Sequence, residues 1–106
     1  METTESRKEL PSNIVLVGDK EIINYAVATN STLLKGQTAI LKARGAKVVR
    51  IFDTIEFLKN RFGVKAVIDK VISSSENLVS QNNTARVVTA LEVHVKIEEV
   101  KKEEKT

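Results

Sequence analysis

The sequence predicts a two-layer α+β fold of order β-α-β-α-β-β, with two helices on one face of a four-stranded mixed sheet. Two short apolar runs each lead into a segment with helical spacing of its apolar residues, and a later segment alternates apolar and polar residues. Because crossovers through a helix are right-handed, we expect the first two strands to be parallel, with their carboxyl ends at one edge of the sheet.

The first strand and helix are predicted between residues 13 and 35. Residues 13–17 are a continuous apolar run rich in β-branched side chains, which is typical of a central strand. Gly18 ends this run, and Asp19 is predicted to cap the helix that follows over residues 21–35. Beside its main apolar stripe, this helix has a second row that we expect to be buried: Ile23, Val27 and Leu34.

Residues 38–43 are predicted to form the second strand, and residues 47–62 the second helix. On a helical wheel, one stripe of this helix should pack on the sheet: Val48, Ile51, Phe52, Ile55, Leu58 and Phe62. Phe57 falls on the opposite side, near Thr54. It is either a single exposed ring, which needs no explanation, or a contact with a partner.

The last part of the domain is predicted to be an antiparallel hairpin. Residues 64–72 are strand-like, with an irregularity at residues 69–70 that indicates a bulge. Residues 73–84 are polar and predict a long, mobile loop, and residues 86–97 alternate regularly. We therefore expect a hairpin arm at about residues 73–86.

One globular domain is expected over residues 13–97, with a flexible lead at residues 1–12 and a charged, disordered tail at residues 98–106. The chain has a net charge of +3, and since each terminal segment carries −1, the domain carries +5. No cysteine is present, so disulfide and thiolate chemistry are excluded. No apolar run is long enough to predict a membrane span, and residues 1–12 do not have the pattern of a signal peptide.

Cationic side chains follow both predicted strand-to-helix turns. If the two strands are parallel, these turns emerge together, and their cations share one rim with two helix N-termini, an arrangement that suits phosphate. The central candidates are Lys20, Lys42, Arg44 and Lys47, with Arg50 and Arg86 outside them.

Enzyme chemistry is not predicted. His94 is the only histidine; it lies on the polar face of a strand, without a cysteine or second histidine to share a metal, and reads as a surface residue. Gly18 and Gly45 occupy strand-to-helix turns but belong to no dinucleotide-binding or phosphate-loop motif. We therefore expect no metal, no cofactor and no small-molecule substrate.

The cations favour sequence-independent binding to a nucleic-acid backbone, because the sequence has no basic recognition helix, zinc module or pair of base-stacking aromatic residues. The alternative is a ribonucleoprotein or protein-interaction scaffold subunit with weak DNA affinity. Phe57 and the nearly uncharged arm favour that alternative.

The chain resembles the Alba family of small, basic archaeal chromatin proteins that bind DNA and RNA. The resemblance covers about residues 11–97 and depends on residues 11–18 (PSNIVLVG), 24–25 (NY), 42–45 (KARG), 53–54 (DT) and 60–62 (NRF). It implies a fold like the carboxyl-terminal domain of translation initiation factor 3. It also implies a cytoplasmic, chromosome-associated protein that forms a homodimer, or a heterodimer with a paralogue, on double-stranded DNA or RNA.

The resemblance also implies roles for individual residues. Lys20, Lys42 and Arg44 match basic positions of the family, Arg86 matches an arginine at the base of the arm, and Phe62 matches the aromatic residue through which neighbouring dimers touch. The hairpin arms would reach towards the minor groove. Asp19 departs from the pattern, because the family often has there a lysine whose acetylation lowers DNA affinity. We therefore expect this chain to bind DNA more weakly than a typical family member does, or to prefer RNA or a heterodimer.

Overall fold

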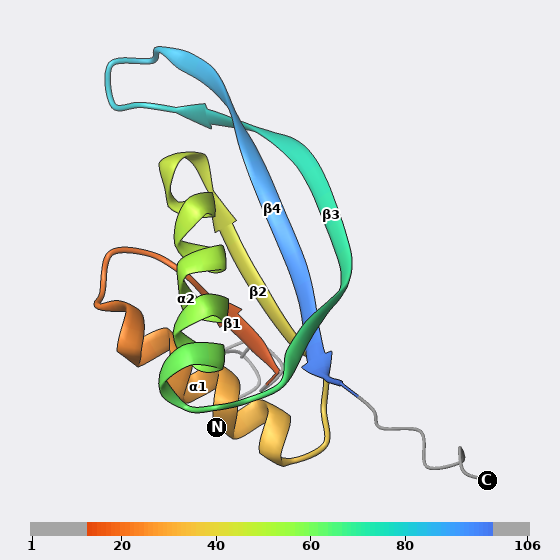
Figure 1. The fold of residues 1–106 in the computed structure, drawn as a ribbon. Helices are drawn as coiled ribbons and strands as arrows, with labels where there is room; N and C mark the ends of the chain where they lie inside the picture. The colour runs from red at the N-terminus through yellow and green to blue at the C-terminus, as the bar shows by residue number, and fades with distance from the viewer. Residues whose placement is uncertain (1–12, 99–106) are drawn as a thin grey trace, which may run out of the picture.

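The computed structural model describes residues 13–98; the predicted lead at residues 1–12 and all but the first residue of the predicted tail lie outside this range. Figure 1 shows the predicted order β-α-β-α-β-β, which is confirmed. A short 3₁₀ turn, Gly45–Lys47, precedes the second helix. The elements are β1 (Ile14–Leu16), α1 (Ile22–Leu34), β2 (Ala39–Arg44), α2 (Val48–Arg61), β3 (Ala66–Val79) and β4 (Ala85–Ile97).

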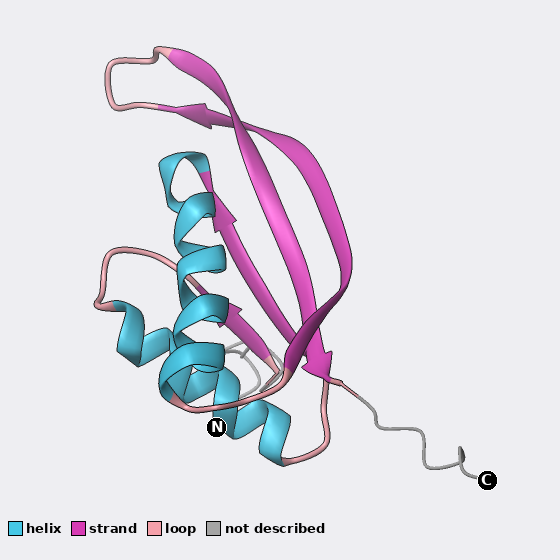
Figure 2. Cartoon of the chain, in the orientation of Figure 1, coloured by secondary structure: helices cyan, strands magenta, loops and turns pink. Residues whose placement is uncertain are grey.

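The four strands form one mixed sheet in the order β1-β2-β4-β3. As predicted, β1 and β2 are parallel, whereas β4 pairs antiparallel with both β2 and β3. Both helices cover the same face of the sheet (Figure 2), with α1 packed near β1 and β2 and α2 also reaching β3 and β4. No helix within the described range is long and apolar enough to cross a membrane.

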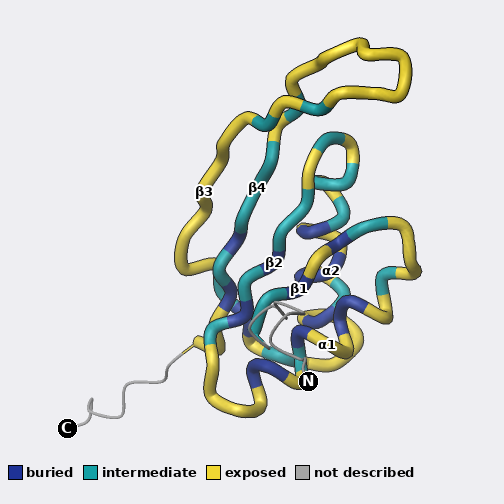
Figure 3. The backbone as a smooth tube through the Cα atoms, turned by 180° about the vertical axis from the view of Figure 1, so that it is seen from behind, coloured by how far each residue is buried: buried dark blue, intermediate teal, exposed yellow. Residues whose placement is uncertain are grey.

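The core lies between the two helices and the sheet. Its fully buried side chains come from β2 and β4, where Leu41 pairs with Val93, from the inner stripe of α2, which includes Ile51 and Leu58, and from Thr29 of α1. In Figure 3 the buried positions follow the lower sheet and the inner helix faces, and the arm above them is exposed. The alternation of β4 therefore predicted its buried face correctly, since Val93 and Val95 are both fully buried.

Two expectations for α1 were wrong. Its second apolar row is exposed, because the helix packs on the sheet and on α2 through Tyr25, Ala26 and Thr29 and leaves Ile23, Val27 and Leu34 outside. The N-cap residue is Glu21 rather than Asp19, and it makes no side-chain capping hydrogen bond. The Asp19 carboxylate instead pairs with Lys47, the last residue of the 3₁₀ turn before α2.

The predicted orientation of α2 was also partly wrong. Thr54 is fully buried, with its hydroxyl donating to the Arg50 carbonyl at 2.8 Å, and Phe57 packs against the core rather than projecting away from it. Phe52 and Phe62, predicted to be buried, are 39% and 36% exposed. The wheel treated the sheet as the only neighbour of α2, whereas α1 packs beside it and covers a second flank.

The predicted loop over residues 73–84 was wrong as well. β3 continues to Val79, which pairs with Ala85, and a compact turn closes the hairpin through a hydrogen bond from the Ser80 N–H to the Thr84 carbonyl at 2.9 Å. The arm beyond the body is largely exposed, with Glu76, Leu78 and Val88 half-buried on one face, so the arm part of β3 can carry polar residues without alternation. The predicted bulge is present as a register shift between Ile68 and Lys70.

Candidate nucleic-acid interface

The turns that follow β1 and β2 lie side by side, as their parallel pairing requires. Two contacts join them directly. The Lys47 ammonium forms an ion pair with Asp19 at 2.7 Å, and the Arg50 guanidinium donates a hydrogen bond to the Lys20 carbonyl. The two turns that carry Lys20 and Lys47 therefore lie together, and the role of these cations stays a prediction.

Tyr25 fixes the conformation of the β1–α1 turn. Its buried hydroxyl oxygen accepts hydrogen bonds from the backbone N–H groups of Gly18, at 2.9 Å, and Lys20, at 2.8 Å. Gly45, in the other turn, has a φ of 62°, which favours glycine, whereas Gly18 has no positive φ. A tyrosine one turn into α1 thus shapes the segment that carries Lys20, a role that the sequence did not reveal.

Tyr25→Phe is expected to loosen this turn while the fold is retained. Two partly buried N–H groups lose their acceptor, and leaving a donor unsatisfied typically costs about 1–3 kcal/mol in the free energy of unfolding. Urea denaturation measures the loss, and NMR hydrogen exchange at Gly18 and Lys20 locates it. Unchanged exchange at these two amides would contradict the role assigned to Tyr25.

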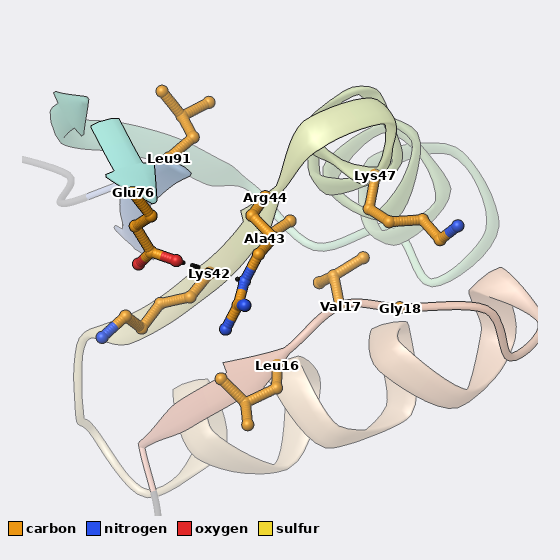
Figure 4. Close-up of a pocket in the computed structure, with 9 residues that line it drawn as sticks. All are labelled: Leu16, Val17, Gly18, Lys42, Ala43, Arg44, Lys47, Glu76 and Leu91. Atoms are coloured by element: carbon orange, nitrogen blue, oxygen red, sulfur yellow. Dashed lines mark ion pairs between the residues drawn. The ribbon is translucent and has the colours of Figure 1, made fainter. Parts of the chain in front are cut away.

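A shallow hollow of about 380 Å³ lies between the two turns and the root of the arm. Three cations line it, and Figure 4 shows that Lys42 and Lys47 point to opposite sides while Arg44 lies between them. Charged side-chain groups that diverge in this way do not enclose a single phosphate. Their spread suits successive phosphates of a polymer.

Each of these three cations has a carboxylate partner, which the sequence did not predict. Arg44 pairs with Glu76 at 3.3 Å, Lys42 lies 4.0 Å from Glu92, and Lys47 pairs with Asp19. The pairs are open to solvent: the Arg44 and Glu76 side chains are 58% and 43% exposed. Exposed pairs contribute little to stability, so a phosphate can compete for the cations.

Glu92 also contacts the lone histidine. It lies across the β2–β4 ladder from Lys42, and its other oxygen is 2.7 Å from Nε2 of His94. His94 lies on the polar face of β4, as predicted, although its side chain is only 15% exposed. The Lys42, Glu92 and His94 side chains thus form a polar row on the sheet face opposite the helices.

Lys47 lowers the pKa of Asp19 below the ordinary carboxyl value, first through the side-chain hydrogen bond and then through its charge. Asp19 is therefore ionised at neutral pH and remains paired with Lys47. The pair stabilises the fold above the ordinary carboxyl pKa, and this contribution disappears as the pH falls through the lowered value.

The outer candidates occupy different places. Arg50 holds the Lys20 carbonyl, and its Nε is buried without a hydrogen-bond partner among the described residues, so the side chain supports the turn as well as adding charge. Arg86 pairs with Leu78 near the tip of the arm, not at its base as the resemblance implied. Since β-strand side chains alternate, Arg86 lies on the same sheet face as Arg44, whose partner in β4 is Ala90.

The two aromatic candidates contact each other at the end of α2. The rings of Phe57 and Phe62 meet edge to face with centroids 5.6 Å apart, and the Arg61 guanidinium lies 5.2 Å from the centre of the Phe57 ring. Phe57 is therefore largely occupied within the monomer. Phe62 has the free surface needed to contact a partner.

Comparison with known proteins finds relatives that share the name Alba. The chain is 32% identical over 85 residues to the DNA/RNA-binding protein Alba of Methanocella arvoryzae, covering 79% of this chain and 88% of that protein. It is also 32% identical to DNA/RNA-binding protein Alba 1 of Archaeoglobus fulgidus, over 79% of this chain and 94% of that one. No family model matches the chain.

Solved structures show the same similarity. Alba from Thermoplasma volcanium superposes with a TM-score of 0.70 at 25% identity, covering 78% of this chain and 98% of that one. Alba1 from Trypanosoma brucei shares the fold, with a TM-score of 0.67 at 20% identity over 86% of this chain and 74% of that one.

Proposed function

Because this chain belongs to the Alba family, whose curated members are named DNA/RNA-binding proteins, we propose that it binds double-stranded DNA, and RNA, without regard to sequence. The proposed contacts are to backbone phosphates, and the role is binding without catalysis. The proposed place of action is the chromosome, in the cytoplasm.

The observation that carries this proposal is the joined pair of turns. Lys20, Lys42, Arg44 and Lys47 come from segments far apart in the sequence, yet the parallel pairing of β1 and β2 and the Arg50 hydrogen bond hold their turns together. The divergent cations favour a polymer over a small nucleotide. Phosphate contacts of this kind carry no sequence information, so similar affinity for unrelated sequences is expected.

The arm extends the same interface. Arg86 shares a sheet face with Arg44, and the tip beyond it offers polar groups from Ser80, Gln81 and Asn82 without any charge. In Figure 1 the arm projects above the start of α2, in a direction that would let it follow a groove while the rim contacts phosphates. This geometry supports the proposed minor-groove contact.

An apolar strip supports assembly into a dimer. Phe52 is exposed on the flank of α2 away from α1, and Ile68 and Val71 of the edge strand β3 are exposed on the face of the sheet that the helices cover elsewhere. Large apolar side chains grouped in this way are typical of interfaces. We propose that the strip packs against a second copy of the chain, or against a paralogue.

Phe62→Ala is expected to leave dimers intact but to abolish cooperative packing of neighbouring dimers on DNA, because it removes the exposed ring at the end of α2. A gel-shift titration measures cooperativity, and sedimentation measures the dimer. Val49→Ala is a matched control, since it truncates another exposed apolar residue of α2. Cooperativity that persists in Phe62→Ala would reject this role.

The alternative function is a ribonucleoprotein or protein-interaction scaffold subunit. Its support is the carboxylate beside each of three rim cations, which lowers the net attraction for DNA, together with the exposed outer row of α1. Titration of several unrelated duplex DNAs and a duplex RNA separates the two functions. Equal affinity for all DNA sequences supports the proposed function, and negligible affinity for every duplex supports the scaffold.

A further inference from the structure

The Arg44–Glu76 ion pair links the arm to the body of the molecule, in addition to the sheet that joins them. Arg44 is the last residue of β2 and pairs with Ala90, which in turn pairs with Ser74. From that row outwards the sheet has only β3 and β4. Glu76 lies in this two-stranded part, opposite Val88, and its carboxylate reaches back to the Arg44 guanidinium at 3.3 Å.

An isolated two-stranded hairpin is only marginally stable in water, so the direction of the arm depends on contacts at its root. Arg44 is also the central cation of the rim. One guanidinium therefore both holds the arm and faces the position of a phosphate. A phosphate on Arg44 competes with Glu76, and because the pair is exposed it separates at little cost.

We propose that Glu76 is an electrostatic latch on the arm, and that a backbone phosphate releases it by taking Arg44. In the free protein the latch favours one direction of the arm and screens the central cation. On the polyanion the Arg44 side chain turns to phosphate, and the arm becomes free to adjust to the groove. This release on DNA or RNA rests on the proposed function, whereas the latch itself does not.

The arm direction can be measured without any nucleic acid. The chain has no cysteine, so cysteines introduced at Gln81 on the arm tip and Ser31 on α1, both exposed, carry the only two spin labels of each chain. Mixing with an excess of unlabelled protein leaves one labelled chain in each proposed dimer. Double electron–electron resonance then gives the distribution of distances between arm and body. We expect a narrow distribution in the parent protein and a broader one after Glu76→Gln or in high salt. With bound random-sequence duplex DNA we expect the mean distance to shift, because the released arm takes a new direction along the groove. Glu56→Gln, which removes an exposed acid of α2, should leave the distribution narrow.

Affinity gives the second readout. Glu76→Gln should strengthen binding to random duplex DNA by about two- to fivefold, the range that corresponds to an exposed ion pair, and Glu56→Gln should not. A distance distribution that Glu76→Gln leaves unchanged overturns the latch, whatever the protein binds. If no variant binds any duplex while Glu76→Gln broadens the distribution, the latch stands and the proposed function fails.

Discussion

Arg44→Glu is expected to weaken binding to every duplex DNA by about ten- to a hundredfold, the loss that follows from removing one charge-assisted contact and adding a repulsion. Arg44 lies between Lys42 and Lys47 at the centre of the rim. A glutamate at this position repels phosphate. It also lies near Glu76, the carboxylate that pairs with Arg44 in the parent protein, and repels it. Fluorescence anisotropy with labelled random duplexes measures the change.

Lys35→Glu is the matched control for this reversal. It changes the net charge by the same amount, but it lies at the carboxyl end of α1, whereas the rim is at the amino end of that helix. A small effect of Lys35→Glu beside a large effect of Arg44→Glu separates the rim from general electrostatic attraction. Loss of affinity for one sequence only, or equal losses in both variants, would contradict backbone binding at the rim.

Asp19→Lys is expected to have the largest opposite effect, a gain in affinity of about tenfold or more, since one new charge-assisted contact alone is of that size. The substitution frees Lys47, which Asp19 holds at 2.7 Å, and adds a cation to the turn that carries Lys20. Asp19→Asn frees Lys47 without adding charge, so it should give a smaller gain. The measurement is affinity for the same random duplex.

The control for Asp19→Lys is Glu56→Lys, which makes the same charge change on the exposed side of α2. The pKa of Asp19 is lowered by Lys47, so the carboxylate remains charged across neutral pH. The gain in Asp19→Asn should therefore be constant from about pH 6 to pH 8, where ordinary carboxyl groups are ionised. A gain in Glu56→Lys as large as in Asp19→Lys would show that net charge, not position, sets the affinity.

The fold followed from the sequence because its strands and helices are amphipathic in simple ways. β4 alternates over its whole buried length, and Val93 and Val95 face the helices as predicted. Prediction failed where an element had no single buried face. The arm strands are largely exposed, so nothing in residues 73–79 marks them as a strand, and Phe57 packs against the core from outside the main apolar stripe of α2.

The candidate site was predicted in part for similar reasons. Parallel pairing of β1 and β2 brings the two turns together, and that pairing can be deduced from chain order. The carboxylates that meet the rim depend on the register of strands distant in sequence. Glu92 faces Lys42 only because β2 and β4 pair in one register, and Glu76 reaches Arg44 diagonally across β4. The sequence did show one carboxylate near the rim, because Asp19 directly precedes Lys20.

The central claim is that cations from separate segments bind a nucleic-acid backbone together. The most direct test is the dissociation constant for a random duplex DNA, measured over a range of salt concentrations. Each neutralised phosphate contributes about −0.9 to the slope of log affinity against log salt, so full use of Lys20, Lys42, Arg44 and Lys47 gives about −3.6 per chain. A steep slope that becomes shallower in Arg44→Glu is the predicted result, and negligible binding at low salt, or affinity independent of salt, would contradict the claim.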